Sequence, residues 1–128
     1  MNSYSAVQSY SNVKVHSGVE SASPHRLIQM LFEGALERIA QAKGAMAQNQ
    51  IARKGELIGK AIAIVGGLQG SLNDKEGGSL AVNLDELYDY IIRRLTRANF
   101  ENNTDYLDEC GRLLGEIKTA WDTIGSQV

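Results

Sequence analysis

The chain carries four stretches in which apolar residues recur three or four positions apart, the spacing of one face of an α-helix. The first stretch begins at Ser23-Pro24, where a hydroxyl that can cap a helix precedes a proline suited to the first helical position. Polar segments separate the stretches, and no period-two alternation competes with the helical pattern. The pattern predicts helices over about residues 24–48, 51–72, 80–99 and 104–124.

Four amphipathic helices joined by short turns bury their apolar faces best when sequence neighbours lie antiparallel. The segment 73–78 has the composition of a turn, and Ser79 can cap the third helix. Residues 1–20 show no sustained apolar stripe, so we expect a mobile N-terminal arm there. The predicted fold is all-α, an antiparallel up-down-up-down four-helix bundle over residues 21–128.

Length and charge exclude several classes of protein. A chain of 128 residues suits one domain, and a formal charge of −2 gives no net basic field to attract nucleic acid or anionic lipid. The N-terminus lacks the basic and apolar regions of a signal peptide, and no apolar run approaches the roughly 18 residues needed to span a bilayer. We therefore expect a cytoplasmic protein that binds neither nucleic acid nor membrane.

The side chains that could carry chemistry are few. The single cysteine, Cys110, excludes an intrachain disulfide or a multi-cysteine zinc site, and its place on the fourth apolar stripe predicts a buried thiol. Neither His16 nor His25 has a cysteine near it, and no helical pattern in the arm brings Glu20 to His16. No combination supplies an acid, a base and a nucleophile together. We expect no catalytic site, no metal site and no cofactor.

The third predicted helix carries acidic residues in its first half and arginines in its second, an order that complements the helix dipole. Asp89 lies four residues before Arg93, so the two can form an ion pair on the helix surface. A guanidinium can also bind a carboxylate of a partner in a bidentate manner. One row spaced four apart is a candidate for such a contact: Asp85, Asp89, Arg93 and Arg97.

Glycine is abundant for a helical protein. There are thirteen glycines, and many fall inside the predicted helices, where each costs about 1 kcal/mol relative to alanine. Two interpretations stay open, tight packing between helices or a surface free of side chains against which another backbone can lie. Tyr88 and Tyr90 lie two residues apart and so face different sides of one helix, which leaves one available at the surface if the other is buried.

Two long motifs resemble the FliS family of flagellin export chaperones. They are SASPHRLIQMLFEGA at residues 21–35 and NLDELYDYIIRRLTRAN at residues 83–99, the second close to the family pattern NLxxLYDYMxRRLxxAN. Shorter matches around Lys60 and at Ala120-Trp121 extend the resemblance over nearly the whole chain. The departures are mild, with Ile91 where methionine is common and Phe32 where tyrosine is common.

The resemblance implies a non-enzymatic chaperone. Such proteins bind the disordered C-terminal region of flagellin in the cytoplasm, prevent premature polymerisation and deliver flagellin to the type III export gate. It also implies that a tyrosine-bearing N-terminal arm can cover a groove when the partner is absent; the candidates here are Val7, Tyr10 and Val13. The candidates for the flagellin-binding grooves, which mix core and groove roles, are Leu27, Ile28, Leu31, Leu84, Leu87, Tyr88, Ile91 and Arg94.

Two alternatives remain open at this point. The charged row of the third helix could make the chain an adaptor whose main partner is an export-gate protein or an anti-sigma factor. The same grooves could also join two copies of the chain in a homodimer.

Overall fold

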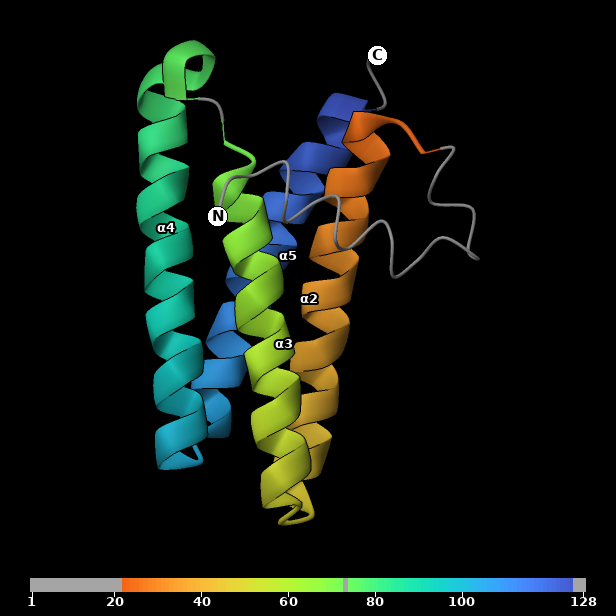
Figure 1. The fold of residues 1–128 in the computed structure, drawn as a ribbon, viewed down its shortest axis with the longest axis vertical. Coiled ribbons are helices and arrows are strands. Elements are labelled where there is room, and N and C mark those ends of the chain that lie inside the picture. The colour runs from red at the N-terminus through yellow and green to blue at the C-terminus, as the bar shows by residue number, and fades with distance from the viewer. Residues whose placement is uncertain (1–21, 73, 126–128) are drawn as a thin grey trace.

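The computed structural model describes residues 22–72 and 74–125. They form four α-helices: α2 (Pro24–Ala47), α3 (Ile51–Gly70), α4 (Asp74–Glu101) and α5 (Thr104–Gly125). α2 and α4 each pack against both α3 and α5, and successive helices run in opposite directions (Figure 1). The predicted all-α antiparallel bundle is confirmed.

Ser23 and Pro24, from which the start of α2 was predicted, do form the start of this helix. The hydroxyl of Ser23 accepts a hydrogen bond of 3.1 Å from the backbone N–H of Arg26, and Pro24 is the first helical residue. The N-cap prediction is therefore confirmed. α2 ends in a tight turn in which Asn49 has a φ of 58°, a left-handed conformation that asparagine tolerates better than most residues.

The start of α4 differs from the prediction of a turn. Helical structure begins at Asp74, and the break falls at Gly78, which has a φ of 54° and a ψ of −131°. Such a backbone conformation suits glycine because it has no Cβ. A helical turn over residues 74–77 is thus set off from the main part of α4, so the prediction of a turn was wrong for these residues.

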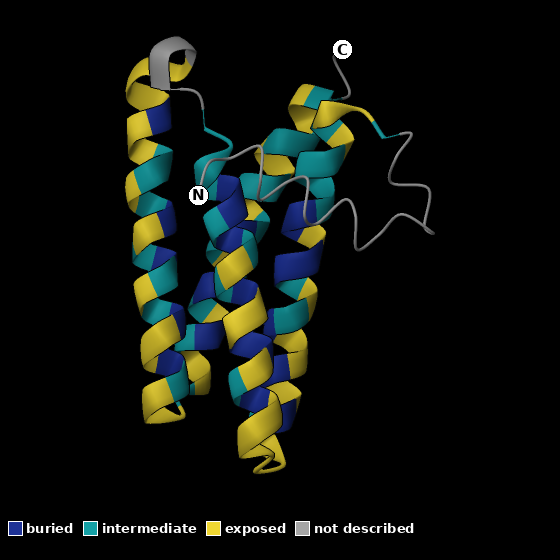
Figure 2. Cartoon of the chain, in the orientation of Figure 1, coloured by how far each residue is buried: buried dark blue, intermediate teal, exposed yellow. Residues whose placement is uncertain are grey.

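The core runs along the inner faces of all four helices, where the buried residues lie in Figure 2. Cys110 is fully buried, as predicted, and burial raises the pKa of its thiol to about 12, so the thiol is protonated at neutral pH. Tyr88 is buried while Tyr90 is half-buried, which confirms that the two rings face different sides of α4.

The glycines inside the helices do not share one explanation. Gly34 and Gly67 are buried in α2 and α3, where tight packing remains a sufficient explanation. A Cβ added at any of four other helical glycines would meet no atom within 4 Å, so packing between helices does not explain them; these are Gly44, Gly59, Gly66 and Gly115. They leave stretches of helix surface without side chains.

Candidate functional site

An apolar cleft of about 490 Å³ opens at the end of the bundle where α2 and α4 begin and α3 and α5 end. All four helices contribute to it, because an up-down-up-down order brings these four ends together. The α2 and α3 sides consist of Ile28, Phe32, Leu68, Ser71 and Leu72. The α4 and α5 sides consist of Leu80, Leu84, Tyr88, Glu116, Ile117, Ala120, Trp121 and Ile124.

Large apolar side chains reach solvent at the rim of the apolar cleft. Leu80 is 64% exposed on α4, and Ile124 is 51% exposed on α5. A continuous apolar surface of this kind marks a binding site more often than it marks chance exposure, because water disfavours it. The polar groups in the lining are few, with Glu116 the one charged residue among the lining residues. The cleft suits an apolar segment of a partner rather than a polar small molecule.

The structure separates the predicted groove residues into three groups. Ile28, Leu84 and Tyr88 line the apolar cleft. Leu31 and Ile91 are fully buried in the core instead. The others lie outside the cleft: Leu27 and Leu87, which are half-buried, and Arg94. The assignment of any of them to flagellin binding stays a prediction.

Several residues of the cleft were absent from the predicted site, among them Leu68, Ile117 and Trp121. Each lies on the apolar face of its own helix. The signal that identifies them is their place along the chain: they lie at the C-terminal ends of stripes that meet at one end of an antiparallel bundle. Where these stripe ends meet, the core does not bury every apolar side chain, and the remaining ones line the cleft.

Arg94 takes part in a cluster between α4 and α5. Its Nε donates to Glu109 Oε1 at 2.8 Å, and the hydroxyl of Tyr90 donates to Glu109 Oε2 at 2.6 Å. These two hydrogen bonds, that from Tyr90 first, lower the pKa of the Glu109 carboxyl. The Arg94 guanidinium also lies 3.9 Å from the centre of the Tyr106 ring. Its contacts are therefore with the bundle itself.

The charged row on α4 is largely occupied by contacts within the bundle. The side-chain amide of Gln69 on α3 donates to Asp85 Oδ1 at 3.0 Å and to Asp89 Oδ1 at 2.8 Å. Arg97 forms an ion pair with Glu101 at 2.7 Å. The predicted pair of Asp89 with Arg93 is wrong, because Asp89 turns to Gln69. Within residues 22–72 and 74–125, Arg93 is the member of the row without an ion pair or hydrogen bond.

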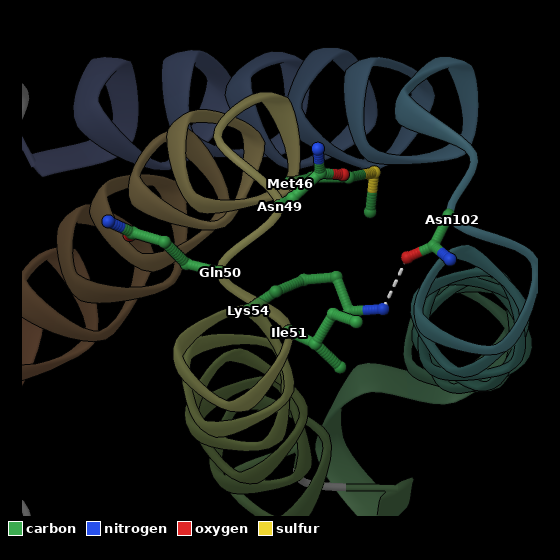
Figure 3. A pocket seen from close by; sticks show the side chains of 6 residues that line it. All are labelled: Met46, Asn49, Gln50, Ile51, Lys54 and Asn102. Atoms are coloured by element: carbon green, nitrogen blue, oxygen red, sulfur yellow. Dashed lines mark hydrogen bonds between the residues drawn. The ribbon is translucent and has the colours of Figure 1, made fainter.

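A second, smaller pocket of about 220 Å³ lies at the opposite end of the bundle, beside the turns that follow α2 and α4. Lys54 of α3 reaches into it, and Figure 3 shows its amine directed at Asn102. The Lys54 Nζ donates to the backbone oxygen of Asn99 at 2.9 Å and to Asn102 Oδ1 at 2.5 Å. Since Asn99 lies in the last turn of α4, the amine caps that helix and complements its dipole.

The part of the chain that the structure describes contains no group of three or more histidine, cysteine or acidic residues able to hold a metal ion. None of the described helices contains the long, nearly uncharged apolar run that a bilayer-spanning helix requires. The predicted arm residues Val7, Tyr10 and Val13, together with His16 and Glu20, lie outside the described residues.

The sequence is similar to flagellar proteins over nearly its whole length. A family model described as "Flagellar protein FliS" matches residues 6–128. The "Flagellar secretion chaperone FliSB" of Pseudomonas aeruginosa is 52% identical over 124 residues, which cover 97% of this chain and 98% of that protein. The "Flagellar secretion chaperone FliS" of Vibrio cholerae is 44% identical, with coverage of 93% and 88%. That of Salmonella typhimurium is 44% identical, with coverage of 97% and 93%.

Proposed function

This chain belongs to the FliS family of flagellar secretion chaperones, and on that premise we propose that it binds the disordered C-terminal segment of flagellin in the cytoplasm. It acts as a secretion chaperone and not as an enzyme. Binding keeps flagellin from polymerising early and supports its delivery to the type III export apparatus. The observation that carries the proposal is the apolar cleft, which all four helices line at one end of the bundle.

The chemistry of the cleft suits a client that is disordered before it binds. Such a segment loses conformational entropy when it becomes ordered, so it needs a large apolar surface to offset that loss. Leucine, isoleucine and aromatic side chains of the cleft supply this surface for the apolar face of a client helix. Positions such as Gly59 and Gly66, where a Cβ would meet no atom within 4 Å, leave room for an extended part of the client.

A peptide from the C-terminal segment of flagellin should bind the chain at a one-to-one ratio, with a Kd below roughly 10–50 µM, or about −6 to −7 kcal/mol. Isothermal titration calorimetry measures both quantities. A peptide of the same composition in scrambled order is the control, since it keeps the apolar content and loses the spacing of the apolar face. If the native peptide binds no better than the scrambled one, flagellin is not the client.

The N-terminal arm is proposed to cover the apolar cleft when no client is bound. α2 begins at Pro24, one turn before the cleft residue Ile28, so a segment joined there has a short path to the cleft. Val7, Tyr10 and Val13 would compete with the client from within the same chain, at a high effective concentration.

Deleting residues 1–20 should therefore raise the affinity for the flagellin peptide several-fold, because the competitor is removed. Replacing Val7, Tyr10 and Val13 together with serine in the full-length chain should give the same gain without shortening it. Calorimetric titration of the three proteins measures the change. An unaltered affinity in both variants would refute the arm's role and leave the client assignment intact.

The remaining partner predictions have less support. An export-gate protein or an anti-sigma factor was predicted from the charged row of α4, and most of that row is engaged within the bundle. A homodimer through the cleft would compete with the client, so dilution of the free chain before titration separates the two. The adaptor partners and the homodimer therefore stay predictions from the sequence.

A further inference from the structure

Trp121, the one tryptophan of the chain, is held on the bundle by His25, which lies 96 residues away in sequence. The two rings stack with their centres 4.6 Å apart and their planes 9° from parallel. The indole Nε1 donates to the backbone oxygen of His25 at 3.0 Å. In return the His25 Nε2 donates to the backbone oxygen of Trp121 at 2.8 Å. The contact joins the start of α2 to the end of α5, which lie side by side in Figure 1.

The position of the His25 ring depends on a glycine. Gly125 follows Trp121 by one helical turn, and a Cβ at that position would overlap the His25 ring. The imidazole thus lies against α5 between Trp121 and Gly125, and the absence of a side chain at residue 125 is what admits it.

A separate polar contact also joins the two helices. One turn further along α2, the side-chain amide of Gln29 donates to Asp122 Oδ1 at 2.7 Å and bridges the same pair of helices. Lys118 supports that bridge through Asp122 Oδ2 at 2.6 Å. What His25 adds is control of the indole, since the Gln29 bridge includes no part of Trp121.

Trp121 in turn lines the apolar cleft together with Ile117 and Ile124. An indole ring at a half-buried position can adopt several rotamers unless neighbouring groups hold it. Ordering a side chain at the moment of binding lowers affinity, whereas a ring that is already fixed avoids this loss. We propose that His25, admitted by Gly125, is a positioning residue that fixes Trp121 as a preformed side of the apolar cleft. The proposal rests on the proposed function, because the affinity it affects is that for the client.

The near-ultraviolet circular dichroism of Trp121 reports directly on whether its indole is fixed. In the free full-length chain, His25→Ala and Gly125→Ala should both weaken the near-ultraviolet circular dichroism of the tryptophan, because an indole that samples several rotamers loses that signal. His25→Phe should recover part of it, since a ring can stack again without the Nε2 hydrogen bond. Every variant keeps the backbone oxygen of residue 25 that accepts from Trp121 Nε1, so a weakened signal reports on the lost His25 side chain and not on a lost acceptor. The matched control, Gln29→Ala, should leave the signal unchanged.

The same variants are then titrated with the flagellin peptide. His25→Ala and Gly125→Ala should bind about two- to tenfold more weakly, and Gln29→Ala should stay within about twofold. Far-ultraviolet spectra and melting curves confirm that each variant is folded.

Three outcomes would overturn the positioning role. The first is an unchanged tryptophan signal in His25→Ala. The second is a loss of that signal in His25→Ala without a loss of peptide affinity. The third is a loss of signal and affinity in Gln29→Ala as large as that in His25→Ala. If the unaltered chain fails to bind the peptide, the proposed function falls. In that case the near-ultraviolet circular dichroism of the chain without peptide still shows whether His25 fixes the indole of Trp121.

Discussion

Replacing Lys54 with methionine is expected to lower the free energy of unfolding by about 2–3 kcal/mol. Lys54 is only 4% exposed, and its amine donates to Asn99 O and Asn102 Oδ1. Asn99 O belongs to the last turn of α4, where carbonyl groups lack a partner within the helix. Methionine fills much of the space of the lysine stem but leaves both oxygens without this donor. Urea denaturation monitored by far-ultraviolet circular dichroism measures the difference.

Lys60→Met is the matched control for this loss. Lys60 lies on the same helix and pairs with Glu56 at 3.1 Å, but its side chain is about half exposed. Solvent screens such a pair, so its removal should change stability far less than the loss of the buried Lys54 amine does. Equal losses in the two variants would show that the amine of Lys54 does not stabilise the end of α4.

The sequence predicts the fold well because the signals for it are local. The capping residue Ser23, the proline after it and the spacing of apolar residues fix a helix from contacts within a few turns. The start of α4 shows the limit of such signals. Composition marks residues 73–78 as a turn, yet a single residue with a positive φ, Gly78, makes the break, and residues before it are helical. Composition cannot distinguish one break residue from a longer turn.

The site was predicted less completely, because it is formed by contacts between helices. Ile28 and Ile91 belong to equally apolar motifs, yet one lines the cleft and the other is in the core. The spacing of Asp89 and Arg93 permits an ion pair, and Gln69 on another helix binds Asp89 instead. The amine of Lys54 likewise finds Asn102, which is 48 residues away. A pattern of residues along one helix does not show which side chain on another helix each residue contacts.

Leu80 offers the largest expected effect on client binding. Leu80→Asp should weaken the affinity for the flagellin peptide about ten- to hundredfold, or by about 1.4–2.7 kcal/mol. Leu80 lines the cleft and is 64% exposed, so the free chain can hold an aspartate there in contact with water. A bound client would cover that carboxylate, and losing its water without a cationic partner is costly. Calorimetric titration gives the affinity, and a melting curve shows that the fold is retained.

Val82→Asp is the matched control, because it adds the same negative charge to α4 at a position that the client is not expected to cover. Val82 lies two residues further along α4, is 50% exposed and is not among the residues that line the cleft. The two variants have the same net charge and carry the added carboxylate on the same helix, so long-range repulsion affects both alike and weakens with added salt. We expect Val82→Asp to bind within about twofold of the unaltered chain at every salt concentration. If the two variants lose affinity equally, the client does not cover Leu80, and the apolar cleft is not its binding site.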